Sequence, residues 1–340
     1  VSSGIPRCSR SRIKPEKDLH PGKKRAVMGC MGGPKTDALE KQFPFVDVFM
    51  PPQQYDPLLD LVSRRMGVDR EGCIGPLTAT PNVSTFIPII HGCDKFCSFC
   101  IIPYRRGREN SRPIKEIVEE TSSLVQRGVK EVTLLGQNID SYGHDLEGDI
   151  DLGDLFRDID SVERLKRIRF LTSHPNDMSK HIIDSIAELD KVCEHINLPI
   201  QAGSDSVLYN MRRGYTRDQY LDKIDQIRQT IPNVSLSTDV IVGFCGESDK
   251  DFDETLDIIK SVRFDKVHAA VYSNRPGTIA SRKFDNDIPD DAKKSRFVEL
   301  ENLQKKISTE INAGNLNRVE QVLCEEVDNK RANGRHLIRR

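Results

Sequence analysis

The stretch His91-Gly-Cys93-Asp-Lys-Phe-Cys97-Ser-Phe-Cys100 directly follows an apolar run that begins at Ser84. Its spacing is C-x3-C-x2-C, with three cysteines in eight residues and no fourth cysteine close by. A structural zinc site takes four protein ligands in a closed tetrahedron. A cubane [4Fe-4S] cluster has four irons, so three cysteines leave one iron open to a substrate or cofactor. The spacing therefore favours such a cluster over a zinc knuckle or clustered core cysteines.

The composition fits a metal-binding protein of a reducing compartment. A chain of 340 residues predicts two or three domains. Its nine cysteines are an odd number in a long chain, which argues against a disulfide framework. No apolar run approaches the roughly eighteen residues that cross a bilayer. The 51 basic and 52 acidic residues nearly cancel, so net charge neither supports nor excludes a nucleic-acid partner. We expect a cytoplasmic monomer without a membrane partner.

The main region, residues 84–285, predicts an open (β/α)6 barrel. Six apolar strand-like runs alternate with helical patterns, fewer than the eight units of a closed barrel. The expected strands are Ser84–His91, Glu131–Gly136, Arg167–Ser173, His195–Ile200, Val234–Gly243 and Lys266–Ser273, and the expected helices include Ile114–Arg127, Met178–Leu189, Thr216–Thr230 and Asp251–Val262. In parallel β/α folds the chemistry lies at the carboxyl ends of the strands. The cysteines follow the first strand and so lie at that end.

Smaller regions flank the barrel. Residues 1–66 predict part of an α/β domain, with strands at Lys24–Gly29 and Val46–Met50 and helices at Pro34–Gln42 and Tyr55–Arg65. A linker covers residues 67–83 and is rich in Gly, Pro and Thr. Residues 286–316 predict a connecting helix, and residues 317–340 the start of a small β domain with a strand at Val319–Val327.

The block Cys93-Asp-Lys-Phe-Cys97-Ser-Phe-Cys100-Ile-Ile-Pro-Tyr-Arg-Arg-Gly-Arg-Glu-Asn-Ser-Arg-Pro113 resembles the methylthiotransferases, a radical S-adenosylmethionine (SAM) family. Further blocks match in order: Leu134-Leu-Gly-Gln-Asn138, Ser141-Tyr-Gly143, Arg167-Ile-Arg-Phe-Leu-Thr-Ser-His-Pro175, Leu198-Pro-Ile-Gln-Ala-Gly-Ser-Asp205, Met211-Arg-Arg-Gly-Tyr-Thr216, Ser237-Thr-Asp-Val-Ile-Val-Gly-Phe-Cys-Gly-Glu247 and Tyr272-Ser-Asn-Arg-Pro-Gly277. The resemblance covers residues 24–330. The Gly-Gln-Asn and Thr-Ser-His-Pro blocks are most similar to the MiaB branch.

That branch adds a methylthio group to C2 of N6-isopentenyladenosine at position 37 of tRNA, next to the anticodon. The resemblance implies the same reaction here. Alternatives are a methylthiotransferase for threonylcarbamoyl-adenosine tRNA or for a ribosomal protein, and a non-catalytic homologue that binds RNA or an iron-sulfur cluster. The resemblance also implies a TRAM-like RNA-binding domain at residues 317–340 and a reductant such as flavodoxin or ferredoxin.

The resemblance implies two kinds of cofactor site in the barrel. Cys93, Cys97 and Cys100 are expected to hold the radical SAM [4Fe-4S] cluster as thiolates. Residues at strand ends are expected to contact S-adenosylmethionine: Phe99, Gly136, Gln137, Asn138, Ser173, Gln201, Gly243, Gly246 and Glu247. His174 lies among them as a pocket residue or a core histidine. Cys245 stands where the family usually has proline, and we interpret it as a tolerated small residue.

The family holds an auxiliary [4Fe-4S] cluster with three cysteines of its N-terminal domain. Cys30, in Met28-Gly-Cys30-Met31, matches the third of these ligands. The first ligand is missing, and the surroundings of Cys8 do not match the second. We therefore expect this chain, which looks truncated or altered at its N-terminus and within the TRAM-like domain, to hold the auxiliary cluster poorly.

An RNA partner is predicted from local basic clusters, since such clusters suit phosphate contacts. The expected RNA-binding residues are Arg105, Arg106, Arg108, Arg112, Arg212 and Arg213. The expected partner is the tRNA anticodon loop, a single strand whose base can be splayed into a pocket.

Overall fold

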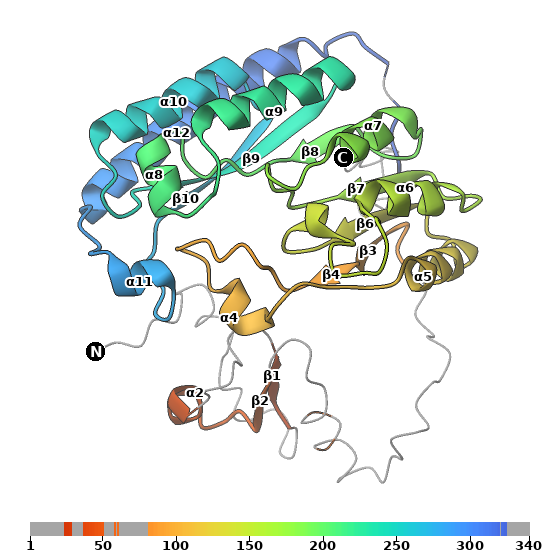
Figure 1. Cartoon of the computed structure of the whole chain (residues 1–340), viewed down its shortest axis with the longest axis horizontal. Coiled ribbons are helices and arrows are strands. Elements are labelled where there is room, and N and C mark those ends of the chain that lie inside the picture. Colours follow the sequence, from red (N-terminus) through yellow and green to blue (C-terminus); the bar gives the residue numbers. More distant parts are fainter. Residues whose placement is uncertain are drawn as a thin grey trace, which may run out of the picture.

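The structure is a computed structural model that describes residues 24–28, 37–50, 58, 60, 81–319 and 321–324. Its centre is a set of six parallel strands in two groups of three (Figure 1). The first group runs in the order β3, β6, β7 and the second in the order β8, β9, β10. Their bounds are β3 Ser84–Pro88, β6 Glu131–Leu135, β7 Arg167–Phe170, β8 His195–Asn197, β9 Ser235–Val242 and β10 Lys266–Val271.

Backbone contacts between β7 and the segment that leads into β8 join the two groups. Ile168 and Val192 form a parallel bridge, and the amide of Cys193 donates to the carbonyl of Ile168. Within the described residues, β3 and β10 do not pair with each other. The barrel is therefore open, as the sequence predicted.

Helices cover the outer side of this sheet. In Figure 1, α9, α10 and α12 lie along the β8–β10 group, and α5, α6 and α7 lie beside β3, β6 and β7. The helices of this region are α4 Ile102–Arg106, α5 Ile114–Gln126, α6 Leu152–Asp160, α7 Lys180–Glu188, α8 Asp205–Asn210, α9 Arg217–Thr230, α10 Asp249–Val262, α11 Ile279–Lys283 and α12 Asp290–Ala313, with a 3-10 turn η1 at Ile139–Ser141. Apolar side chains of strands and helices form one buried core.

Side-chain caps explain where several of these helices begin. Thr216 and Ser248 each accept a hydrogen bond from the third helical amide of α9 and α10, and the side chain at that position bonds back. Such capping boxes satisfy amides that have no partner inside the helix. Helix α6, which is absent from the helices expected from the sequence, also begins with a capping box, at Asp151.

The first predicted strand, Ser84–His91, is split in the structure. Strand β3 ends at Pro88, which has no amide hydrogen to continue a ladder. Residues Ile90–His91 form β4, which pairs antiparallel with β5, Asn110–Ser111. This pair closes the base of the loop that carries the three cysteines. At the neck, a Cβ on Gly92 would lie 1.9 Å from the carbonyl oxygen of Arg108, so only glycine fits.

The flanking regions agree with the sequence prediction at the amino-terminal side of the barrel, but not at the predicted strand Val319–Val327. Strands β1 (Ala26–Met28) and β2 (Val48–Met50) are parallel, with α2 (Asp37–Gln42) between them in the chain. The predicted helix Tyr55–Arg65 is described only at Leu58 and Asp60, which are helical. Of the predicted strand Val319–Val327, residues 319 and 321–324 are described and form no strand. No helix among the described residues is long and apolar enough to span a membrane.

Candidate functional site

The three cysteines lie in the loop between β4 and β5, at the carboxyl end of the parallel strands. All three are free, Cys97 is buried, and Cys93 and Cys100 are half-buried. Two of the sulfurs accept a hydrogen bond from nitrogen. Nη1 of Arg213 lies 3.2 Å from Sγ of Cys97, and the amide of Ile102 lies 3.5 Å from Sγ of Cys100. Hydrogen bonds to cysteine sulfur are a common feature of iron-sulfur sites, where they tune the reduction potential.

The arrangement of the sulfurs fits a cluster better than a single zinc ion. In tetrahedral zinc sites the sulfur atoms lie about 3.8 Å apart, given Zn–S bonds of about 2.3 Å. Among the described residues, the one group of three metal-ligating atoms within 4.8 Å of one another is Asp151, Asp154 and His181, so the three cysteines are spread more widely. Burial raises the pKa of Cys93 to about 12 and also raises that of Cys100. Iron must therefore replace these protons when it binds.

Ser98, between the second and third cysteines, fixes the loop against the barrel. Its amide donates to the carbonyl of Met211, and its hydroxyl donates to that of Asn210 at 2.7 Å. Its own carbonyl accepts from the amide of Ala280, also at 2.7 Å. These bonds tie the cysteine loop to the segments after β8 and β10. The loop is thus held in place before any cofactor binds.

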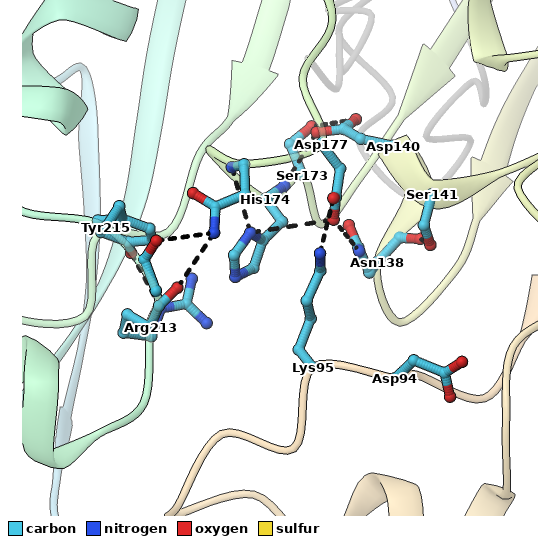
Figure 2. A network of polar contacts seen from close by, with 12 residues as sticks. Asp94, Lys95, Asn138, Asp140, Ser141, Ser173, His174, Asp177, Arg213 and Tyr215 are labelled. Carbon is cyan, nitrogen blue, oxygen red and sulfur yellow. Dashed lines mark hydrogen bonds and ion pairs between the residues drawn. The ribbon is translucent and has the colours of Figure 1, made fainter.

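A carboxylate joins the cysteine loop to the ends of β6 and β7. Asp177 accepts from Nζ of Lys95 and from Nδ2 of Asn138, both at 2.6 Å (Figure 2). Lys95 lies between the first two cysteines, and Asn138 is one of the predicted SAM contacts. The sequence prediction included neither Lys95 nor Asp177. The place of Lys95 between two ligands was an available signal, whereas nothing in the sequence singled out Asp177.

Three residues that follow β6 and β7 carry buried polar atoms without partners among the described residues. Within the described part of the chain, Oε1 of Gln137, Oδ1 of Asn138 and Nε2 of His174 have no hydrogen-bond partner. Burial lowers the pKa of His174 to about 2, with Arg213 and Lys95 adding to the effect, so its imidazole is neutral. Buried polar atoms nearly always find partners in folded proteins. Unmatched atoms here fit a site that a polar cofactor completes.

Among the other residues predicted to contact SAM, Gly136, Gly243 and Glu247 are in close contact with neighbouring protein groups. Gly136 packs closely, since a Cβ there would lie 2.5 Å from Cγ2 of Ile90. A Cβ on Gly243 would meet Lys293 at 2.3 Å. The Glu247 carboxylate accepts from the Gly243 amide and from Arg296, each at 2.7 Å. Packing and ion pairing thus account for part of this glycine-rich block, and its contact with SAM stays a prediction.

The remaining predicted contacts are spread along the site. The hydroxyl of Ser173 donates to Asp140, and Gln201 has a φ of 76° in a short bridge to Val240. Phe99 packs against the edge of the apolar core. Gly246 also has a positive φ, 76°, with open space beside it. Cys8 and Cys30 lie outside the described residues.

The predicted RNA-binding arginines separate into two groups. Arg213 is only 6% exposed, and its guanidinium contacts Cys97, Tyr215 and the carbonyl of Pro199, so burial removes it from the RNA-binding set. Arg112 is engaged with Glu120 and the carbonyl of Pro88. The accessible members include Arg108, whose side chain is 73% exposed, and Arg212.

Arg212 lines a groove beside the cysteine loop. The groove encloses about 510 Å³ and is lined by Lys95, Tyr209, Asn210, Arg212, Gly214, Ile279, Lys283 and Phe284. Tyr209 is 83% exposed there. An exposed ring among cations is a combination that suits a nucleic-acid strand.

An open β/α half-barrel with a three-cysteine loop after its first strand defines a radical SAM protein. The model of the Radical SAM superfamily matches residues 87–259. Among solved structures, the cobalamin-dependent S-adenosylmethionine radical enzyme OxsB, with aqua-cobalamin and S-adenosylmethionine bound, has a TM-score of 0.52 at 12% identity. That match covers 84% of this chain and 43% of OxsB, and it supports the fold alone.

Curated relatives narrow the class. A protein of Dehalococcoides mccartyi is 44% identical over 322 residues, covering 94% of this chain and 74% of the relative. One from Roseiflexus sp. (strain RS-1) is 46% identical, covering 93% of this chain and 67% of the relative. Both are named tRNA-2-methylthio-N(6)-dimethylallyladenosine synthase. The chain therefore belongs to the tRNA-2-methylthio-N(6)-dimethylallyladenosine synthase family of radical SAM enzymes.

Proposed function

We propose that the protein adds a methylthio group to C2 of N6-isopentenyladenosine (dimethylallyladenosine) at position 37 of tRNA. The observation that carries the proposal is the C-x3-C-x2-C loop at the carboxyl end of the half-barrel, in a chain 44% identical to a named synthase over 94% of its length.

Cys93, Cys97 and Cys100 would hold the cluster, and the nitrogen donors of Cys97 and Cys100 would stabilise their thiolates. When bound, the cluster and SAM supply the radical chemistry that is needed at an aromatic carbon whose hydrogen no ordinary base removes. The bonds from Ser98 hold the cysteine loop in position, and Asp177 fixes Lys95 and Asn138. Gln137, Asn138 and His174 would direct their free polar atoms toward SAM.

The RNA would approach the exposed side of the cysteine loop. The proposed substrate of the protein is the single-stranded anticodon loop of tRNA, from which a base can leave the stack and enter the site. Arg105, Arg106, Arg108 and Arg212 are the arginines that we propose for phosphate contacts. A flavodoxin or ferredoxin would supply the electron. Cys30 matches one ligand of the family's auxiliary cluster, which we propose that this chain holds poorly. We propose that the protein is a monomer in the cytoplasm.

The test is an anaerobic assay of the reconstituted protein with SAM, dithionite and tRNA that carries N6-isopentenyladenosine. Mass spectrometry follows 5'-deoxyadenosine and the methylthiolated nucleoside. We expect both products from the protein and neither from Cys97→Ala, with Cys193→Ala as the matched cysteine control at the opposite end of the sheet. Deoxyadenosine without methylthiolated nucleoside would mean a working radical site on a chain that lacks either its auxiliary cluster or its proper substrate, and iron analysis for a second cluster tells these two apart. Absence of both from a protein with a full cluster would refute the radical activity itself.

A further inference from the structure

We infer that Arg213 raises the reduction potential of the cluster held by Cys93, Cys97 and Cys100. Arg213 lies far along the chain from these cysteines, in the segment that follows α8. Its guanidinium reaches Sγ of Cys97 at 3.2 Å. Through this contact it places a fixed positive charge beside a cluster ligand.

The geometry of Arg213 is set by three separate contacts. Nε donates to the hydroxyl of Tyr215 at 2.9 Å, Nη2 donates to the carbonyl of Pro199 at 3.0 Å, and Nη1 faces Cys97. The guanidinium carbon also lies 5.3 Å from the centre of the Tyr215 ring. The side chain is thus held in one orientation, with one nitrogen directed at the sulfur.

Among the described residues, no carboxylate pairs directly with the charge of Arg213. Its side chain is only 6% exposed, and its hydrogen bonds go to the hydroxyl of Tyr215, the carbonyl of Pro199 and Sγ of Cys97. A buried charge without a partner is unfavourable, and arginine does not lose its proton in proteins. The Cys97 thiolate and the cluster it holds would be the negative charge in direct contact with Arg213, whereas Asp239, whose pKa is raised by burial and lowered in part by Arg213, lies beyond ion-pair distance.

The consequence is electrostatic. Reduction adds one electron, and hence one negative charge, to a cluster that already carries the charges of its thiolates. A nearby cation stabilises the reduced state more than the oxidised state, and net charge and hydrogen bonds to sulfur are known controls of the potential. Arg213 therefore makes the cluster easier to reduce. In the test below, dithionite supplies this electron and no covalent bond breaks in the step.

Neighbouring residues provide matched controls. Arg212 carries the same charge next in the chain but is exposed at the surface, where solvent screens it. Tyr215→Phe removes one hydrogen-bond partner of Arg213 and leaves its charge in place. If the charge near Cys97 sets the potential, only substitutions of Arg213 itself should change it strongly.

The experiment is a redox titration of the reconstituted protein, followed by electron paramagnetic resonance (EPR) without RNA. Iron and sulfide analyses confirm the loading of each variant, and the signal that changes on addition of SAM identifies this cluster. For Arg213→Gln we expect the reduced-to-oxidised ratio at a given potential to fall about tenfold, a shift of about 59 mV for a one-electron couple. Arg212→Gln and Tyr215→Phe should change the ratio less than about twofold, and Arg213→Lys should lie between Arg213→Gln and the unchanged protein.

The outcomes separate redox tuning from a structural role. An unchanged potential in a fully loaded Arg213→Gln protein would overturn the inference. If Arg213→Gln does not bind the cluster, the test uses Arg213→Lys, which keeps the charge. A reduced-to-oxidised ratio clearly less than about tenfold below that of the unchanged protein supports the role of the charge, and a ratio lowered about tenfold or more contradicts it. Loss of the cluster from both variants would assign Arg213 to the scaffold and overturn the inference. Because no RNA is present, none of these results depends on the proposed substrate.

Discussion

At the amino end of the parallel strands, buried Glu131 accepts hydrogen bonds from Ser84 and Arg169 and lies 3.4 Å from Arg167. At the carboxyl end, Gln137, Asn138 and His174 each keep a buried polar atom without a partner among the described residues. Each such atom costs about 1–3 kcal/mol when nothing satisfies it. Unmatched atoms also occur at the amino end, at Oδ1 of Asp160 and Oε1 of Gln304, but Glu131 there is held by an ion pair and hydrogen bonds, whereas the three atoms at the carboxyl end follow β6 and β7 on the side of the cysteine loop. The comparison is therefore between a paired charge that stabilises the fold and a polar cluster at the strand ends where β/α folds bind ligands.

Removal of a cluster ligand should give the largest effect. In Cys97→Ala the loop loses one of its three thiolates, so we expect iron content and formation of 5'-deoxyadenosine to fall to background. Cys193→Ala alters a cysteine at the amino end and should keep both. Iron analysis and chromatography of the nucleosides measure the two quantities. A loaded and active Cys97→Ala protein would remove the basis for placing the site at this end.

A smaller loss is expected from the carboxylate that joins the cysteine loop to the strand ends. Asp177→Asn removes the charge that holds Lys95, so SAM should bind less well and its apparent KM should rise about 10- to 100-fold. Asp184→Asn breaks an exposed lysine–aspartate pair on α7 and serves as the control. Steady-state kinetics with varied SAM tests the change. Equal KM values for the two variants would show that Asp177 does not position the site.

At the amino end of the strands, substitution of Glu131 should lower the stability of the protein and leave its chemistry unchanged. Glu131→Ala leaves Arg167 and Arg169 without their buried carboxylate, which should lower the free energy of unfolding by about 2 kcal/mol after solvent screening of the half-buried arginines. Deoxyadenosine formation per cluster should stay the same. Urea unfolding gives the first quantity, with Glu188→Ala, part of an exposed pair with Arg157, as the control. A stable but inactive Glu131→Ala protein would reverse the proposed roles of the two ends.

The smallest effect should come from the pH dependence of His174. Its pKa is about 2 in the folded protein, because of burial and then Arg213 and Lys95, against 6.5 for an ordinary histidine. Below pH 6.5, His174 therefore binds a proton in the unfolded chain but not in the folded protein. The free energy of unfolding consequently falls as pH falls. Between pH 7.5 and 5.5 this amounts to about 1.4 kcal/mol. His174→Gln should lose that part of the pH dependence in urea unfolding, and identical slopes for both proteins would rule it out.

The sequence predicted the features that depend on local patterns. Apolar runs located all six barrel strands, and the cysteine spacing located the loop after the first of them. It could not predict which way a charged side chain points. Arg212 and Arg213 were both assigned to RNA, yet one is exposed and the other is buried against Cys97. Asp177 gave no signal, because its role depends on Lys95 and Asn138, which only the fold brings together.

The most direct test of the central claim is the EPR spectrum of the reduced cluster with and without SAM. Three cysteine ligands leave one iron open at the carboxyl end, so SAM should bind beside that iron and change the spectrum. We predict the change in the unchanged protein and in Glu131→Ala, and its loss in Cys97→Ala. If a protein fully loaded with the cluster gave the same EPR spectrum with and without SAM, this would contradict the assignment of the active site to this end of the barrel.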